Sequence, residues 1–271
     1  MTDFAKGSAT AFSKGHGTGN DFVILADPDN AAPLTNWQIA DLCDRRSGIG
    51  GDGLLRVVRS AKHPEAVELS SEAEWFMDYY NADGSVAEMC GNGVRVFARY
   101  LLEHDLAEPG DIPLATRAGL RTVSCVGDEF RVDMGPARFE GASEAIVDGR
   151  RYAGTRVSMG NPHLVCRVDD PYTLDLHKVP AVDAQLFPTG VNVEFITGPA
   201  NHITMRVHER GVGETRSCGT GAVAAAAVAL GGVGTCTVDV PGGTLTVTVS
   251  TDTTTLTGPA VIVAEGHTNL V

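Results

Sequence analysis

Cys90-Gly91-Asn92-Gly93 and Cys218-Gly219-Thr220-Gly221 are two copies of one short motif, and an apolar run with helical spacing follows each copy. A β-patterned run and a polar, glycine-containing loop precede both copies. Asn81 stands nine residues before Cys90, just as Glu209 stands nine residues before Cys218. This repeated context predicts a duplicated chain with two pseudo-symmetric domains, joined near residues 135–149. A site between two such domains would receive one cysteine from each.

The rest of the chain is rich in short β-patterned runs and poor in helical ones. One helical pattern follows a capping box at Thr35 and Gln38, a second runs from Val94 to Leu102, and a third from Ala222 to Leu230. The third is apolar on every side, which predicts a buried helix with sheet packed closely around it. A hairpin turn is expected at residues 240–244. Strands are expected at residues 21–25, 54–58, 75–80, 130–134, 163–168, 191–196, 235–240, 244–249 and 260–264.

The composition limits the classes of partner. The chain has 271 residues, of which 43% are hydrophobic, and a formal net charge of −13. Nucleic acids and anionic membranes attract clustered Lys and Arg, so this charge argues against both. Met1 to Gly7 lacks the pattern of a signal peptide, and no apolar stretch approaches the roughly 18 residues of a membrane span. We therefore expect a cytoplasmic protein with reduced cysteines. The oligomeric state stays open, with a homodimer among the alternatives.

A cysteine at the start of a helix has a defined chemical use. The first N–H groups of a helix have no partners within it, and the helix dipole adds positive potential there. Neighbouring glycines let a ligand approach this backbone closely, so the position suits a carboxylate. The same field stabilises a thiolate, and we expect it to lower a cysteine pKa from ~8.5 to ~3.5–7.5.

Two such cysteines facing one substrate suggest an acid and a base. Racemisation needs one group that removes a proton from one face of a carbon and another that returns a proton to the opposite face. The intermediate resembles a carbanion delocalised into the carboxylate, and both helix starts would stabilise its charge. Cys90 and Cys218 are the candidates, and this chemistry needs neither a metal nor pyridoxal phosphate. The other four cysteines fit core positions: Cys43, Cys125, Cys166 and Cys236.

The residues by themselves leave alternatives open. Both motif cysteines can be small buried residues that happen to precede helices. Residues 48–53 fit the pattern G-x-G-x-x-G, but they follow a helical pattern and lead into a strand, the reverse of a dinucleotide site. No His or Cys cluster has the spacing of metal ligands. A non-catalytic protein that binds a small zwitterion is a further alternative.

Taken together, the motifs resemble those of the diaminopimelate epimerase family. Residues 15–22, 81–93, 159–163, 190–194 and 209–221 carry the resemblance over most of the chain, in the family's order. It implies interconversion of LL- and meso-diaminopimelate without a cofactor, on the way to lysine and peptidoglycan. It also implies an α/β (α+β) fold of two domains, each a curved, mostly antiparallel sheet or barrel around a central helix, with the active site in the cleft between them. The domains would be residues 1–135, joined by a returning final strand at 262–271, and residues 136–261.

The resemblance assigns roles to individual residues. Cys90 and Cys218 would act as base and acid and exchange roles with the direction of the reaction. The backbone N–H groups of Gly91-Asn92 and Gly219-Thr220 would hold the reacting carboxylate. Arg210 can grip the distal carboxylate with two hydrogen bonds, Glu209 can pair with an ammonium group, and His163 is expected to support the site. Four asparagines are expected to contact the substrate: Asn20, Asn81, Asn161 and Asn192.

Three features qualify the resemblance. Many family members carry Gln where this chain has Gly53, so substrate binding is expected to differ at that point. Proline racemases and hydroxyproline epimerases share the two-cysteine chemistry but usually carry His in place of Asn92, and they are the rival enzymes. The two motif thiols could also form an inactivating disulfide, provided that their Cα atoms approach within about 7 Å.

Overall fold

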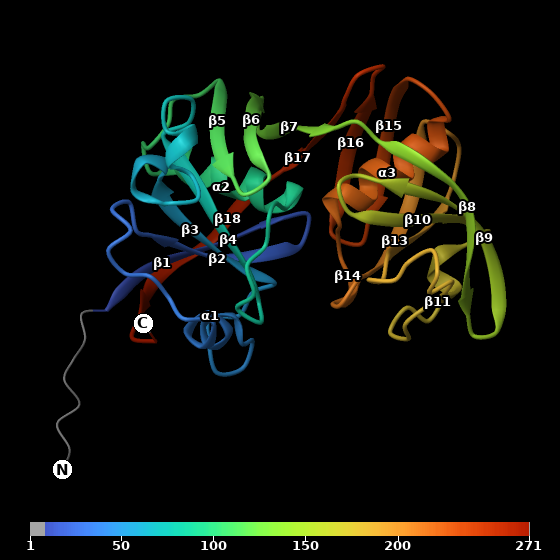
Figure 1. The fold of residues 1–271 in the computed structure, drawn as a ribbon, viewed down its shortest axis with the longest axis horizontal. Helices are drawn as coiled ribbons and strands as arrows, with labels where there is room; N and C mark the ends of the chain where they lie inside the picture. Colours follow the sequence, from blue (N-terminus) through green and yellow to red (C-terminus); the bar gives the residue numbers. More distant parts are fainter. Residues whose placement is uncertain (1–8, 271) are drawn as a thin grey trace, which may run out of the picture. The chain divides into compact units, whose positions relative to one another are not determined.

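The computed structural model describes residues 9–270, which form two compact units (Figure 1). The first unit contains the described residues up to Gly17, then Asp21–Cys125 and those from Ala260 onward. The second contains Thr18–Asn20 and Val126–Pro259. Met1 to Gly7, on which the expected lack of a signal peptide rests, lies outside the described residues. No helix within residues 9–270 is long and apolar enough to cross a membrane.

The first unit is a curved sheet with a central helix, α2 (Gly91–Glu103), which packs against β1 (Thr10–Gly17), β3 (Gly53–Arg59) and β18 (Val261–Thr268). β1 pairs with β18 and with β2 (Asn20–Ala26), and β2 runs parallel to β3. β3 pairs antiparallel with β4 (Trp75–Asn81), β4 runs parallel to β5 (Asp111–Thr116), and β5 pairs antiparallel with β6 (Gly119–Val126). The remaining elements are α1 (Asn36–Cys43) and the 3-10 helices η1 (Ser60–Lys62) and η2 (Val67–Leu69).

The second unit surrounds α3 (Gly219–Leu230) with strands. β8 (Arg138–Val147), β9 (Arg150–Ser158) and β10 (Pro162–Arg167) are antiparallel neighbours, and β10 runs parallel to β12 (Asn192–Thr197). β12 pairs antiparallel with β13 (His202–Glu209), which runs parallel to β15 (Gly234–Val240). β16 (Gly243–Val249), β17 (Thr254–Pro259) and β7 (Glu129–Gly135) continue the sheet, all antiparallel. The short elements are η3 (Pro171–Thr173), β11 (Ala181–Val182) and β14 (Gly213–Thr215).

The two units repeat one order of elements. In each, two parallel strands (β2 and β3, or β10 and β12) are followed by an antiparallel strand (β4 or β13), the central helix, and a strand parallel to the last one (β5 or β15). In the first unit, Phe22 of β2 is the register partner of Gly53 in β3. At the equivalent place in the second unit, His163 of β10 is the register partner of Asn192 in β12. The predicted α+β class, with a curved sheet around a helix in each half, is confirmed.

The helices begin and end where their sequences indicate. Thr35 caps α1 through the complete capping box: its hydroxyl accepts from Gln38 N–H at 3.3 Å, and Gln38 Oε1 accepts from Thr35 N–H at 3.0 Å. α3 ends at Gly231, whose left-handed backbone (φ 62°) suits a residue without a side chain. Most of α3 is buried, because its Ala and Val side chains let the surrounding strands approach closely.

The first boundary lies earlier than the sequence suggested. We expected the first half to reach residue 135, whereas by contacts it ends at Cys125. The reason is β7, which pairs with β17 of the second unit. Thr18–Asn20 also group with the second unit, in which Thr18 Oγ1 lies 2.6 Å from Ser217 Oγ.

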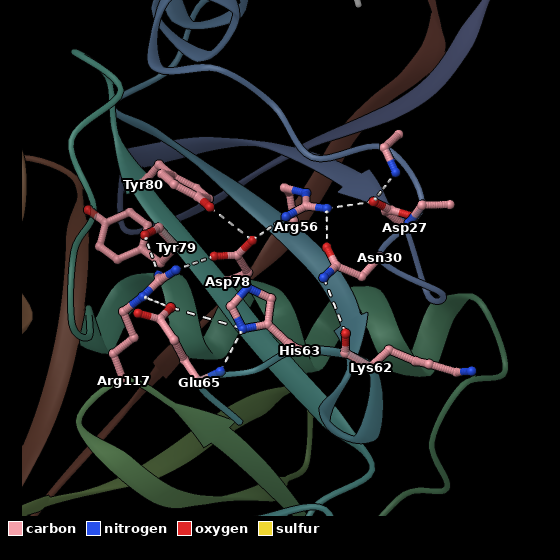
Figure 2. A network of polar contacts seen from close by, with 12 residues as sticks. Asp27, Asn30, Arg56, Lys62, His63, Glu65, Asp78, Tyr79, Tyr80 and Arg117 are labelled. Carbon is pink, nitrogen blue, oxygen red and sulfur yellow. Dashed lines mark hydrogen bonds and ion pairs between the residues drawn. The ribbon is translucent and has the colours of Figure 1, made fainter. Parts of the chain in front are cut away.

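Buried charges join β3 to β4 in the first unit (Figure 2). Asp78 is fully buried and accepts from Arg56 Nη1 at 2.5 Å and from Arg117 Nη2 at 2.6 Å. Arg56 also bonds Asp27 at 2.5 Å, and Arg117 bonds Glu65 at 2.8 Å. Each buried charge thus meets opposite charges, which is the condition under which ions are tolerated in a protein interior.

Candidate active site

Cys218 is the N-cap residue of α3 and is buried. Its extended backbone turns the side chain back over the first helical turn, where Sγ accepts from the Gly221 N–H at 3.4 Å. The Thr220 hydroxyl lies 3.6 Å from the same sulfur. A side chain at 221 would be crowded, because a Cβ there would lie 2.6 Å from Glu194 Oε1 and 3.3 Å from Cys218 Sγ. The start of α3 is therefore packed tightly against Glu194.

The surroundings of Cys218 favour the thiol over the thiolate. Burial raises the pKa of Cys218 well above its ordinary value, and the Glu209 carboxylate raises it further. Hydrogen bonds from Thr220 and Gly221 lower the pKa, but burial outweighs them. The helix field acts only within the first turn and does not replace the water that a thiolate loses here. The expectation that the helix start would lower this pKa is therefore wrong for Cys218.

Cys90 is the N-cap residue of α2 and is half-exposed. Unlike Cys218, its side chain makes no capping hydrogen bond to the helix. The two residues that follow are buried, and Arg95 holds both: its guanidinium donates to Gly91 O at 3.1 Å and to Asn92 Oδ1 at 2.9 Å. The side chain of Asn92 is therefore used within α2, and its backbone is what it can offer to a ligand.

Asn81 ends β4, ten residues along the chain from the start of α2. Its Nδ2 donates to Ser85 Oγ at 3.0 Å, and its Oδ1 accepts from the Tyr79 hydroxyl at 3.3 Å. Tyr79 also explains the glycine at position 53. A Cβ on Gly53 would lie 2.8 Å from Tyr79 Cε2 and 2.6 Å from Tyr80 O, so the Gln common in the family has no room here.

Asn161 and His163 lie in one chain of contacts that reaches the start of α3. Glu194 Oε1 is 2.7 Å from His163 Nδ1, and His163 Nε2 is 3.0 Å from Asn161 Oδ1. Asn161 Nδ2 in turn donates to Thr220 Oγ1 at 3.3 Å. The structure thus brings three predicted site residues, Asn161, His163 and Thr220, into contact within the second unit.

Asn192 has a structural task in addition to any contact with a ligand. Its Nδ2 donates to Pro162 O at 3.1 Å, and its Oδ1 accepts from the Arg210 N–H at 2.9 Å. It thereby ties the segment after β13 to the start of β10. The Arg210 side chain is exposed and donates to Thr189 Oγ1 at 3.3 Å. Glu209 is half-buried and accepts from the Thr215 hydroxyl.

Asn20 is the first residue of β2 and is half-buried. It belongs to the three-residue segment that groups with the second unit. Thr18 anchors this segment with a buried side chain against Ser217 and a left-handed backbone (φ 51°). Gly242 passes so close that a Cβ would lie 1.5 Å from Thr18 O. The segment that carries Asn20 is therefore fixed beside Ser217, the residue immediately before Cys218.

Sequence reasoning did not single out Glu194, whose side chain contacts the predicted site residue His163. It lies in the middle of an apolar strand pattern, Val191 to Ile196, and its side chain is completely buried. A lone acidic residue at an inward position of such a strand is rare without a partner or a role. That signal was available in the sequence, but the partner, His163, lies on a strand 31 positions earlier.

None of the six cysteines forms a disulfide in the structure. Cys43, Cys166 and Cys236 are buried as predicted, and burial raises the pKa of both Cys43 and Cys166 to about 12. Cys125 is half-exposed at the end of β6, so the core assignment is wrong for this residue. In the described part of the chain, no group of three or more His, Cys, Asp and Glu side chains could hold a metal ion.

The fold places the chain in a class of proteins. A phenazine biosynthesis protein of the PhzF family from Bacillus anthracis matches it with a TM-score of 0.71 at 16% identity, over 96% of this chain and 99% of that one. A hydroxyproline epimerase from Agrobacterium vitis, solved with trans-4-hydroxy-L-proline, matches with a TM-score of 0.68 at 15% identity, over 98% and 94%. The chain therefore has the two-unit fold that these proteins share.

The sequence narrows this class to one family. A Streptomyces coelicolor protein named diaminopimelate epimerase is 55% identical over 274 residues, which cover 95% of this chain and 94% of the relative. The diaminopimelate epimerase family matches residues 12–140 and 155–270. The chain belongs to the diaminopimelate epimerase family.

Proposed function

We propose that this chain interconverts LL- and meso-diaminopimelate by moving the α-proton between Cys90 and Cys218, without a cofactor. The supporting observation is 55% identity to a diaminopimelate epimerase over 95% of the chain, together with a cysteine at the N-cap of both α2 and α3. The enzyme is an isomerase, and its reaction serves the synthesis of lysine and of peptidoglycan precursors. We place it in the cytoplasm; whether it forms a homodimer stays a prediction.

We infer the resting roles of the two cysteines from their unequal burial. Cys218 holds its proton, since it is buried with the Glu209 carboxylate nearby, and acts first as the acid. Cys90 is half-exposed and acts first as the base. Its thiolate takes the α-proton, and the electrons of the broken C–H bond move into the substrate carboxylate. The Cys218 S–H bond then breaks and returns a proton to the opposite face of the carbon. The reverse reaction exchanges the roles.

The remaining site residues bind the charged groups of the substrate. The N–H groups of the first turns of α2 and α3 hold the reacting carboxylate, on which negative charge grows in the transition state. The exposed Arg210 guanidinium is free to turn toward the distal carboxylate, since its contact with Thr189 is a single long hydrogen bond. Glu209 pairs with an ammonium group. Asn20, Asn81, Asn161 and Asn192 frame the substrate, with Asn192 acting mainly through the backbone of Arg210 that it holds.

Solvent deuterium exchange tests this proposal directly. Purified, reduced protein is incubated with LL-diaminopimelate in deuterated water, without added cofactor, and the meso product is analysed for α-deuterium. We expect deuterated meso product from the wild type. Cys90→Ser and Cys218→Ser should each lose about a thousandfold in rate, because a serine hydroxyl exchanges its proton poorly at neutral pH. Cys125→Ser is the matched control, since Cys125 lies at the end of β6, outside the proposed site.

The rival activities make different predictions for the same experiment. A proline racemase or hydroxyproline epimerase would exchange deuterium into proline or hydroxyproline and leave diaminopimelate unchanged. A non-catalytic binder of zwitterions would exchange none of the three. Lack of exchange into diaminopimelate by the reduced wild type would overturn the substrate assignment.

A further inference from the structure

Glu194 is a fully buried carboxyl group whose set of partners is incomplete. Oε1 meets His163 Nδ1 at 2.7 Å, and both side chains have no exposed surface. Oε2 has no hydrogen-bond partner within residues 9–270. An ionised carboxylate with one bare, buried oxygen would be costly, whereas a neutral carboxylic acid leaves only a weak acceptor unmatched. Burial also raises the pKa of Glu194, although His163 opposes the change.

The contacts of His163 indicate which of its two ring nitrogens carries a proton. Asn161 uses Nδ2 to donate to Thr220 Oγ1 and presents Oδ1 to His163 Nε2. An amide oxygen can only accept, so Nε2 must carry a proton. In a neutral imidazole Nδ1 is then an acceptor, and the group that faces it is Glu194 Oε1. A protonated Glu194 supplies the donor that Nδ1 requires, and every polar atom between Glu194 Oε1 and Thr220 is then matched.

The first unit has the same order of paired strands but no His–Glu pair at the equivalent positions. Phe22 and Gly53 are register partners in the first unit where His163 and Asn192 are partners in the second, and two residues further along the strand Leu55 stands where Glu194 stands. A Cβ on Gly93, in the first turn of α2, would contact Leu55 and Phe22 at 3.5 Å.

The equivalent space beneath α3 is occupied by a carboxyl group. A Cβ on Gly221, in the first turn of α3, would lie 2.6 Å from Glu194 Oε1. The fold therefore accepts an apolar pair at these two positions, and stability alone does not require Glu194 and His163.

We propose that Glu194 is a positioning residue for the epimerisation: as a carboxylic acid it donates to neutral His163, and through His163 it holds the Asn161 amide as a donor at the start of α3. The inference rests on the proposed function. The oxygen of Asn161 faces His163 and one of its two N–H groups donates to Thr220, so this amide offers the substrate its second N–H. It therefore recognises a carboxylate oxygen and not an ammonium group, next to the N–H groups of Gly219 and Thr220.

Two substitutions at position 194 separate this role from simple packing. Gln retains a donor for His163 Nδ1 without an ionisable group, whereas Leu copies the apolar partner found at the equivalent position of the first unit. The full-length variants Glu194→Gln and Glu194→Leu are compared with wild type in kcat and KM for LL-diaminopimelate. Asp239→Asn is the matched control, because Asp239 is an exposed carboxylate 2.6 Å from the ring of His202.

We expect Glu194→Gln to keep kcat/KM within about threefold of wild type, whereas Glu194→Leu should lose about 10- to 100-fold, with a rise in KM. A smaller folded fraction would lower kcat at constant KM, so the rise in KM identifies the positioning role. Asp239→Asn should change neither kcat nor KM. Equal losses in Glu194→Gln and Glu194→Leu would overturn the inference.

The tautomer of His163 gives a readout that needs no substrate. Nitrogen-15 NMR of the ring-labelled wild type, with His163→Phe to assign the signals, should show a protonated Nε2 and an unprotonated Nδ1 near pH 7. A proton on Nδ1 alone, or on both nitrogens, would overturn the inference even if the epimerase assay succeeds. If the assay fails in the wild type, the proposed function falls, whereas the tautomer still decides whether Glu194 is the donor.

Discussion

The two units place their buried charges on opposite faces of equivalent strands. In β3 of the first unit, Leu55 faces α2, and its neighbour Arg56 points away into the ionic cluster of Figure 2. In β12 of the second unit, Glu194 faces α3, and its neighbour Phe195 points away into an apolar cluster with Leu164. Successive side chains of a strand point to opposite faces, so the same backbone accepts either arrangement.

In the proposed mechanism, the different side chains beneath α2 and α3 let two equivalent cysteines act as an acid and a base. A two-base epimerase must hold one cysteine as acid and the other as base whenever substrate arrives. Identical surroundings would give both cysteines the same intrinsic proton affinity. The buried carboxyl group of Glu194 lies beside α3, and no carboxyl group occupies the equivalent position beneath α2. The surroundings of the two cysteines therefore differ, although each cysteine is the N-cap residue of a helix.

The largest expected effect concerns the charges of the first unit. Asp78→Ala should lower the free energy of unfolding by about 3–5 kcal/mol, because Arg56 and Arg117 would lose a shared, fully buried partner. Urea denaturation followed by circular dichroism measures the change. Asp29→Ala removes an exposed partner of Arg59 and should cost at most about 0.5 kcal/mol. Equal costs for the two variants would show that the ionic cluster does not stabilise the unit.

Alanine substitutions in the first turns of α2 and α3 should change the stability of the protein in opposite directions. Gly221→Ala should destabilise the protein by about 1–3 kcal/mol, because the new Cβ would press on buried Glu194 and on Cys218. Gly93→Ala should be neutral or stabilising by up to about 1 kcal/mol, since its contacts at 3.5 Å are ordinary and Ala favours a helix. Thermal and urea unfolding provide the measurement. A stabilising Gly221→Ala would contradict the close packing of Glu194 beneath α3.

The smallest effect is the pH at which Cys218 reacts. Alkylation by iodoacetamide requires the thiolate, so the rate follows the ionised fraction. Since the pKa of Cys218 is raised, its alkylation should be slow at pH 7 and should still be increasing above pH 9. Mass spectrometry of the Cys218 peptide over a pH series measures the rate. A plateau below pH 8 would show that the helix start, and not the buried surroundings, controls this thiol.

Local sequence patterns were sufficient to predict many of the helices, strands and turns. The capping box at Thr35, the apolar helix from Ala222 and the hairpin near Val240 all formed as predicted, because the interactions that define them lie within a few residues. The contact units divide after Cys125 and not near residue 135, because β7 pairs with a strand more than 100 residues later. No feature of the sequence around β7 records that partner.

The sequence predicted which residues belong to the candidate site better than it predicted their protonation. The repeated motif identified Cys90 and Cys218, and the structure places each at the N-cap of a helix. The lowered pKa expected for a helix start did not hold for Cys218, because burial and the Glu209 carboxylate outweigh the helix field. The contact of Glu194 with His163 went unnoticed because the two residues are 31 positions apart in the sequence.

The sequence by itself determined the repeat, the two cysteines and the helices that they begin, because capping and periodicity act over one or two turns. Only the tertiary structure decided which side chain lies beneath each helix start. Leu55 and Glu194 occupy equivalent strand positions, and strand pairing brings one against Phe22 and the other against His163. Proton affinity depends on burial and on charges a few ångströms away. Those distances exist only once residues far apart in the chain have packed together.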